Sequence, residues 1–298
     1  MNSLTFGRLV TAMVTPFDAQ GQIAFDVATE LAQFLQNSGS EALVVAGSTG
    51  EGTSLSDEEK LNLFAAVAAA VTIPVIAGST SSDTARSVSL TRAVSGTGVA
   101  GVLATTPAYA RPSQAGIAAH LSAVSESTDL PVMLYDIPSR TGRKIGAETS
   151  IALARGHHNV VALKDASGDL VGAAHVVQTV GSQLALYSGD DGLTLAFMAM
   201  GAVGVVSVAS HWAGREFSAM VNAAAENRWD EARRLNEVVA PSCRFESSDS
   251  YPNPLPAKSA MRQLGIPVGQ CRLPLGSSDA TLDALANEAL AQLTVARG

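Results

Sequence analysis

Residues 159–169 read Asn-Val-Val-Ala-Leu-Lys-Asp-Ala-Ser-Gly-Asp, an apolar run that ends in one lysine and a turn. Such an unbroken apolar run is typical of a strand buried on both faces, as in a parallel sheet. Lys164 stands at the end of this strand and is our candidate nucleophile. An ammonium group among apolar neighbours loses solvation, which favours the neutral amine that can attack a ketone and form a Schiff base. For this segment alone, a surface lysine that snorkels from the strand end is the alternative.

Apolar segments followed by turn-forming residues recur along the whole chain. Their starts lie 20 to 32 residues apart, which leaves room for one loop, one helix and one return loop in each interval. Strict alternation of strand and helix predicts either an open doubly wound sheet or a closed barrel. Eight units favour the α/β class with a TIM (β/α)8 barrel. The expected strands are residues 10–14, 42–47, 74–78, 101–105, 131–135, 160–164, 184–187 and 204–208.

Two helix starts can be located from local chemistry. Ser56, followed three residues later by Glu59, predicts a capping box. After the fourth strand, Pro112 is expected at the first position of the next helix, where its missing N–H does no harm.

The C-terminal quarter shows helical spacing without further strands. The sequence therefore predicts a catalytic barrel over residues 1–225 and a C-terminal helical extension over residues 226–298. The expected helices are residues 211–225, which close the barrel, then 227–240, 255–264 and 281–296, with an irregular connection over 247–256.

Composition excludes several classes of protein. The formal net charge is −8 and no Lys/Arg run occurs, which argues against nucleic acid or an anionic membrane as a partner. No apolar run approaches the ~20 residues of a membrane span, and the N-terminus does not resemble a signal peptide, so we expect a cytoplasmic protein. Cys243, Cys271 and the histidines show no metal-ligand spacing, which predicts neither a disulfide framework nor a metal site.

Functional groups in such a barrel gather at the C-terminal ends of the strands. The second strand runs into Gly-Ser-Thr-Gly-Glu-Gly at residues 47–52. Successive backbone N–H groups there can cradle a carboxylate, and the hydroxyls of Ser48 and Thr49 add donors. The alternative is a tight turn that needs glycine for backbone freedom.

Two further strand ends carry tyrosine or paired acids. Tyr135 ends the fifth strand, where a phenol can relay protons, and Arg140 follows, where a guanidinium can bind a carboxylate in bidentate fashion. The alternative is a tyrosine bonded to backbone and a solvated arginine. Asp190 and Asp191 follow the seventh strand, where helix N-capping is favoured over metal binding.

Four motifs together resemble one family. Gly-Ser-Thr-Gly-Glu at 47–51, Tyr-Asp-Ile-Pro-Ser-Arg-Thr-Gly at 135–142, Leu-Lys-Asp-Ala-Ser-Gly-Asp at 163–169 and Ser-Gly-Asp-Asp at 188–191 are similar to those of the dihydrodipicolinate synthase / N-acetylneuraminate lyase family of class I aldolases. The resemblance covers essentially the whole chain. It implies that Lys164 forms a Schiff base with pyruvate and that no metal or organic cofactor is needed.

The resemblance also implies roles for the other candidates. Tyr135, Ser48 and Tyr109 would form a proton relay, with Tyr109 reaching across the interface of a homo-oligomer, a dimer or a dimer of dimers. Thr49 and the backbone around Val206 would bind pyruvate.

Arg140 indicates the synthase branch of the family, in which that arginine holds the carboxylate of L-aspartate 4-semialdehyde. The implied activity is a lyase reaction of lysine and diaminopimelate biosynthesis, the condensation of pyruvate with that aldehyde to 4-hydroxy-tetrahydrodipicolinate. Ser48 departs from the threonine usual in that branch, but it keeps the hydroxyl. The alternatives are N-acetylneuraminate lyase, another pyruvate-dependent aldolase of sugar acids or 4-hydroxy-2-oxoglutarate, and a catalytically silent barrel that binds pyruvate.

The family's lysine feedback site is altered in this chain. Regulated members carry asparagine, glutamate, tyrosine and histidine where this sequence has Ser82, Arg86, Ala108 and Asp57. Arg86 places positive charge where the ammonium group of lysine needs a negative partner. The resemblance therefore predicts an enzyme insensitive to lysine.

Overall fold

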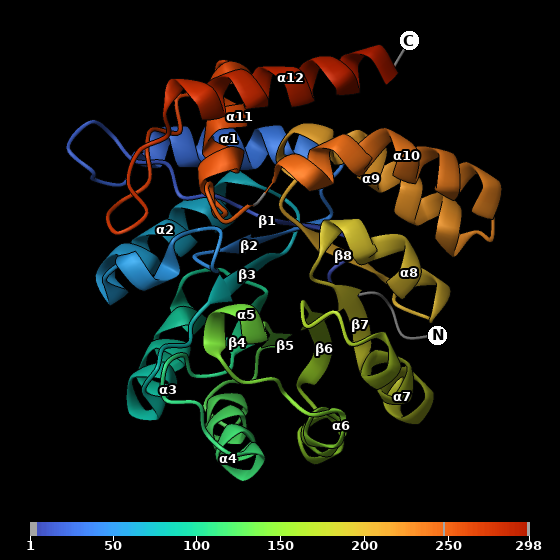
Figure 1. Ribbon diagram of the computed structural model, residues 1–298. Coiled ribbons are helices and arrows are strands. Elements are labelled where there is room, and N and C mark those ends of the chain that lie inside the picture. Colours follow the sequence, from blue (N-terminus) through green and yellow to red (C-terminus); the bar gives the residue numbers. More distant parts are fainter. Residues whose placement is uncertain (1–4, 247, 297–298) are drawn as a thin grey trace.

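The computed structural model describes residues 5–246 and 248–296, and in this part of the chain eight parallel strands close into a barrel (Figure 1). Each strand pairs with its neighbours in sequence, and β1 pairs with β8 through Val10 and Val206. This last pairing confirms the closed barrel over the open sheet. The strands are β1 Leu9–Ala12, β2 Ala42–Val45, β3 Val75–Gly78, β4 Gly101–Thr105, β5 Val132–Asp136, β6 Val160–Asp165, β7 Ala185–Ser188 and β8 Gly204–Ser207.

Helices follow the strands and surround them, as Figure 1 shows. No helix in the described part of the chain combines the length and the apolar character that a membrane crossing needs. The barrel helices are α1 Phe25–Asn37, α2 Asp57–Ala70, α3 Thr84–Ala93, α4 Gln114–Ser125, α5 Pro138–Thr141, α6 Ala147–Gly156, α7 Leu170–Val180, α8 Thr194–Ala199 and α9 Ser210–Ala225, with short 3-10 turns at η1 Gly52–Ser54, η2 Val94–Gly96 and η3 Asp191–Leu193.

Alternation along each strand separates the interior of the barrel from its outer layer. Successive side chains of a strand point to opposite faces. One apolar cluster therefore fills the interior and a second, larger one lies between the strands and the helices. The interior cluster includes Val10, Val44, Ile76, Leu103, Met133, Tyr135, Ala162, Tyr187 and Val206.

The two predicted helix starts have different outcomes. The capping box is confirmed: Glu59 N donates to Ser56 Oγ at 3.1 Å, and Ser56 N donates to Glu59 Oε2 at 2.8 Å. The prediction for Pro112 is wrong, because α4 begins at Gln114. Ser113 caps this helix by accepting a hydrogen bond from Gly116 N at 3.2 Å. A serine hydroxyl satisfies an orphan N–H of the first turn, which proline cannot do.

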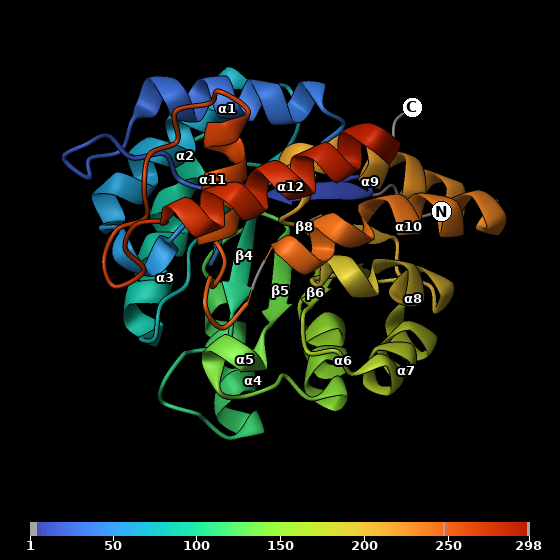
Figure 2. The same ribbon diagram turned by 45° about the horizontal axis from the view of Figure 1, so that its top comes forward.

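After α9, the described residues form three helices: α10 Trp229–Phe245, α11 Leu255–Gln263 and α12 Ala280–Ala296. α10 packs against α9, and α12 lies across α10 and α11 (Figure 2). The predicted end of α10 at residue 240 is wrong, because the helix continues through Pro241. A hydrogen bond from Trp212 Nε1 to Ser242 Oγ at 2.9 Å holds that turn against α9. Apolar residues of these helices join the outer core of the barrel, and a domain boundary at 225/226 stays a prediction.

Candidate active site

Lys164 and Tyr135 lie together inside the C-terminal end of the barrel. They are paired across β5 and β6, and Lys164 Nζ lies 4.2 Å from the centroid of the Tyr135 ring. The whole Lys164 residue is only 4% exposed. Burial excludes the snorkelling alternative for this lysine. An amine beside a phenol in an apolar interior is a suitable arrangement for Schiff-base chemistry with proton transfer.

A pair of buried acids follows on the outer face of the same strands. Asp136 Oδ1 accepts a hydrogen bond from Ile145 N at 3.0 Å, and Asp165 Oδ1 accepts one from Ser167 N at 2.8 Å. Burial raises the pKa of Asp136 to about 7, and burial also raises the pKa of Asp165. These two carboxyls hold the loops that follow Tyr135 and Lys164 by accepting hydrogen bonds from their backbone N–H groups. Sequence reasoning missed this use, although an acid directly after each strand-end residue was visible.

The 47–52 turn after β2 is closely packed. Thr49 is buried, and its Oγ1 accepts a hydrogen bond from Asn253 Nδ2 at 2.9 Å. A Cβ at Gly50 would come within 2.9 Å of Ala46 N, so this position requires glycine. Ser48 is half-buried and lines a cavity of about 350 Å³. The turn therefore needs glycine, and it presents hydroxyls at a strand end, whereas carboxylate binding by this turn stays a prediction.

Asn253 links two of the predicted site residues. Its side-chain amide donates to Thr49, and its backbone carbonyl oxygen accepts a hydrogen bond from Arg140 Nη2 at 2.8 Å. Arg140 lies on α5, beyond the end of β5 (Figure 2), and lines the same cavity as Ser48. Sequence reasoning missed Asn253, because it assigned the 247–256 stretch only to a connection. No local pattern reveals a contact with residues more than 100 positions away.

The seventh and eighth strand ends are joined by Asp191. Its Oδ2 accepts hydrogen bonds from Val208 N at 2.9 Å and Ala209 N at 2.7 Å, which holds the turn after β8. Val206 is buried in the barrel interior just before this turn. Capping is confirmed for Asp190, which accepts a hydrogen bond from Leu193 N at 3.2 Å. In the described part of the chain, no group of three or more His, Cys, Asp or Glu residues is arranged to hold a metal ion.

Glu246, from the C-terminal extension, lies beside Asp191. Burial raises the pKa of Glu246 well above its usual value, and the neighbouring Asp191 raises it further. Two carboxyls in contact share a proton more readily than both ionise.

Tyr109 is not brought to the other candidates within one chain. Its side chain is 97% exposed in the loop after β4, and its φ of 69° lies in the left-handed region. A non-glycine residue in this region is strained and is found mainly at functional sites or contacts.

Three of the four lysines are buried. Lys60 on α2 and Lys258 on α11 are buried, as Lys164 is. Lys258 is paired with Glu51, and Lys144 with Asp169. Lys60 lines the cavity of about 350 Å³, and burial lowers its pKa. Of the four, Lys164 is the one that stands inside the barrel beside a phenol.

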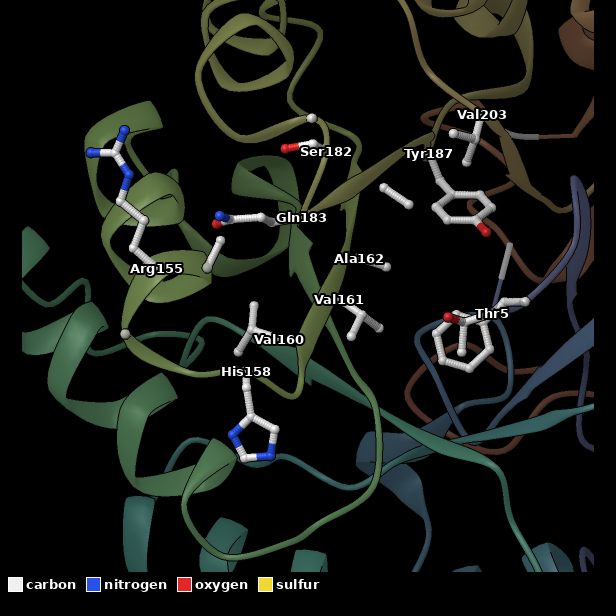
Figure 3. Close-up of a pocket in the computed structure, with 15 residues that line it drawn as sticks. Thr5, Arg155, His158, Val160, Val161, Ala162, Ser182, Gln183, Tyr187 and Val203 are labelled. Atoms are coloured by element: carbon white, nitrogen blue, oxygen red, sulfur yellow. The ribbon is translucent and has the colours of Figure 1, made fainter. Parts of the chain in front are cut away.

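A larger cavity, of about 700 Å³, lies at the opposite end of the barrel. Its lining includes the first residues of β6 and β7, the residue before β8, the end of α6 and the turn after α7 (Figure 3). Figure 3 shows the side chains of Arg155 and His158 pointing away from one another. The hydroxyl of Tyr187 is used in a hydrogen bond to Gly7 O at 2.8 Å. Polar groups do not converge here, so this cavity carries no candidate chemistry.

The chain was compared with known proteins. The model of the dihydrodipicolinate synthetase family matches residues 5–292. The chain belongs to this family. A 4-hydroxy-tetrahydrodipicolinate synthase of Moorella thermoacetica is 43% identical over 274 residues, which cover 91% of this chain and 93% of the relative. The enzyme of that name from Bacillus subtilis is 41% identical over 91% of this chain and 94% of its own.

The fold of the dihydrodipicolinate synthetase family extends over the whole described chain. A crystal structure of DHDPS from Cyanidioschyzon merolae with lysine bound matches with a TM-score of 0.95 and 40% identity, covering 98% of this chain and 100% of the other. The family resemblance carried by the four motifs is thereby confirmed. The individual roles of Lys164, Tyr135, Ser48, Tyr109, Thr49, Arg140 and Val206 stay predictions.

Proposed function

We propose that this protein condenses pyruvate with L-aspartate 4-semialdehyde to give 4-hydroxy-tetrahydrodipicolinate, as a lyase of lysine and diaminopimelate biosynthesis. The observation that carries the proposal is the buried amine of Lys164, 4.2 Å from the Tyr135 ring, at the C-terminal end of a barrel of this family. The relatives from Moorella thermoacetica and Bacillus subtilis bear the name of this activity.

The reaction begins at Lys164. Its neutral amine attacks the ketone carbon of pyruvate, water leaves, and a protonated imine forms. The imine accepts the electron pair released when a methyl proton is lost, which produces an enamine. The enamine carbon then adds to the aldehyde of the second substrate. The amine of that substrate finally displaces Lys164 and closes the ring, which returns the free enzyme.

Proton transfers in this sequence are assigned to Tyr135, with Ser48 and Tyr109 as its relay. The ring of Tyr135 lies 4.2 Å from the amine of Lys164, and its phenol can exchange protons with a hydroxyl partner. Ser48 lies in the 47–52 turn that follows β2, and Tyr109 would enter from a second copy of the chain. Its exposed and strained position in one chain supports a homo-oligomer, and a cytoplasmic location belongs to the same proposal.

Substrate carboxylates are assigned to the ends of β2, β5 and β8. Thr49 and the backbone at Val206 would bind the carboxylate of pyruvate. Arg140 already donates to Asn253 O, and a guanidinium has five N–H donors, so it can also bind the carboxylate of the aldehyde substrate. The imine itself polarises the ketone carbon, and no cofactor takes part in the proposed steps.

The synthase activity is favoured over the alternatives. Arg140 is retained, and both named relatives above are synthases and not lyases of sugar acids. The discriminating assay fixes pyruvate and compares L-aspartate 4-semialdehyde with N-acetylmannosamine and other aldehydes as acceptors. The synthase proposal requires the highest kcat/KM with the semialdehyde.

Borohydride trapping tests the chemistry directly. The protein is incubated with pyruvate, reduced with borohydride, digested and mapped by mass spectrometry. We expect a reduced pyruvyl adduct on Lys164 and none on Lys258, a buried lysine that is already paired with a carboxylate. An adduct elsewhere, or none at all, contradicts the proposed function. Calorimetry with pyruvate then tests the silent-barrel alternative, in which the site binds pyruvate reversibly without chemistry.

A further inference from the structure

Glu51 forms a buried ion pair with the C-terminal part of the chain. Lys258 Nζ lies 2.6 Å from Glu51 Oε1, with the two side chains 1% and 0% exposed. The same ammonium group donates to Gln270 O at 3.0 Å and lies 4.2 Å from the centroid of the Phe17 ring. The second oxygen of Glu51 accepts a hydrogen bond from Arg272 N at 2.8 Å. Both carboxylate oxygens are therefore held by the segment that follows α10.

A buried ion pair is a poor device for stability alone. Removing two charges from water is unfavourable, and an apolar pair of similar volume often stabilises a protein as well or better. The ion pair instead fixes the positions of the two side chains, because their hydrogen bonds have a defined geometry. The pair can therefore position the part of the chain to which it is attached.

Glu51, one partner of this ion pair, belongs to the 47–52 turn. Glu51 has a φ of 53° and a ψ of 34°, a left-handed conformation that a non-glycine residue adopts only when its surroundings impose it. Next to it, Gly50 O accepts a hydrogen bond from Thr15 Oγ1 at 2.6 Å, and a Cβ at Gly52 would come within 2.1 Å of Ala46 O. The backbone of the turn is thus pressed against β2 on one side and held by Glu51 on the other.

A second interaction between the segment after α10 and this turn is a hydrogen bond at Thr49. Asn253 Nδ2 donates to Thr49 Oγ1 at 2.9 Å. Thr49 and Glu51 are two residues apart, and of their partners Asn253 lies just before α11 and Lys258 lies in its first turn. The segment that carries α11 therefore fixes the turn at two points.

We propose that Glu51 and Lys258 are positioning residues that hold the 47–52 turn where Ser48 and Thr49 can act on pyruvate. Neither side chain needs to touch the substrate. The helices after α9 then support the active site, in addition to covering the barrel. This inference rests on the proposed function and deepens it, by assigning a role in pyruvate binding to residues outside the predicted site.

The test uses a charge-free double variant and a matched control. Glu51→Gln with Lys258→Met removes both charges and keeps both volumes, so that no unpaired charge is left buried. The control is Asp283→Asn, which weakens the ion pair of Asp283 with Arg262 at 3.0 Å within the C-terminal helices and leaves Glu51 and Lys258 unchanged. Pyruvate and semialdehyde kinetics are measured well below the melting temperature of each variant, together with hydrogen exchange of the peptide that contains residues 47–52.

The double variant is expected to have a pyruvate KM raised about tenfold, since small displacements of a substrate-positioning group have effects of this size or larger. The semialdehyde KM should stay within twofold, and exchange in the 47–52 peptide should be faster. Asp283→Asn should lower the melting temperature without changing either KM. A pyruvate KM within twofold of the wild type in the double variant, or an equal rise in Asp283→Asn, overturns the proposal.

A conservative variant covers the case in which the double variant does not fold. Glu51→Asp keeps the charge but shortens the side chain by one methylene, so the turn must shift or the pair must separate. It should raise the pyruvate KM severalfold, and unchanged kinetics overturn the proposal. Failure of the proposed function is seen separately, as the absence of a borohydride-trapped adduct on Lys164 in the wild type.

Discussion

The two ends of the barrel differ in what their side chains do. At the N-terminal end lies the larger cavity, of about 700 Å³, whose polar groups point apart or are used in backbone contacts. At the C-terminal end the cavity is half that size, but Ser48 and Arg140 line it, and Lys164 and Tyr135 are paired across the ends of β5 and β6. The site is therefore identified by its chemical groups and not by the volume of its cavity. The loops that carry these groups all leave the barrel at one end because every strand is parallel.

The largest expected difference between the two ends comes from removing the candidate nucleophile. Lys164→Ala should lower turnover by roughly a thousandfold or more, because covalent catalysis is lost and only binding remains. Arg155→Ala, at the N-terminal end, is the matched control and should change kcat/KM by less than about twofold, as expected for a surface change away from the chemistry. Turnover retained in Lys164→Ala would remove the C-terminal end as the site.

A finer test at the same end separates proton transfer from binding. Tyr135→Phe keeps the ring beside Lys164 and removes only the phenol. We expect kcat to fall by about a hundredfold, the range of a general acid or base, while the pyruvate KM changes little. Equal losses in kcat and in pyruvate affinity would assign Tyr135 to binding and not to the relay.

The buried acids behind the site predict a dependence of stability on pH. The pKa of Asp136 is about 7 in the folded protein, against an ordinary value of 3.8, because of burial. Between these values the folded state keeps a proton that the unfolded chain has released, so stability falls as pH rises from about 4 to 7. Asp136→Asn, which cannot ionise, should therefore gain stability relative to the wild type over this window.

The gain is roughly 2 to 3 kcal/mol between pH 5 and pH 8, from the displacement of this one pKa. Urea unfolding of both proteins at the two pH values measures it. Asp279→Asn, at an exposed acid whose pKa is lowered by hydrogen bonds from the backbone at Leu282, is the control and should show no such gain. A pH-independent difference between wild type and Asp136→Asn would show that Asp136 does not titrate in this range.

The smallest effect is expected from free lysine. Lys60 lines the same C-terminal cavity as Ser82 and Ala108, so an ammonium ligand would meet a like charge there, and Asp57 is already paired with Arg86 at 3.0 Å. We expect no inhibition in an activity titration with millimolar lysine. The Cyanidioschyzon merolae relative, whose structure has lysine bound, serves as the positive control for binding. Strong inhibition at sub-millimolar lysine would contradict this prediction.

Much of the fold and part of the site could be predicted from local sequence. Apolar runs at regular spacing predicted the strands and the closed barrel, because burial on both faces requires such runs. The position of Lys164 followed from the end of one run, and the Ser56 capping box from four consecutive residues. The start of α4 and the end of α10 were predicted wrongly, because Ser113 is the N-cap of α4 and leaves Pro112 outside the helix, and because α10 continues through Pro241.

The sequence by itself determined the barrel, the strand ends and the candidate nucleophile, since side-chain periodicity and turn chemistry act between near neighbours. Only the tertiary structure decided that Asn253 joins Thr49 to Arg140, and that Lys258 is buried against Glu51. It also decided that Tyr109 stands exposed in a single chain. The physical reason is that these contacts join residues far apart in the chain, and their geometry exists only after the helices have packed around the closed sheet.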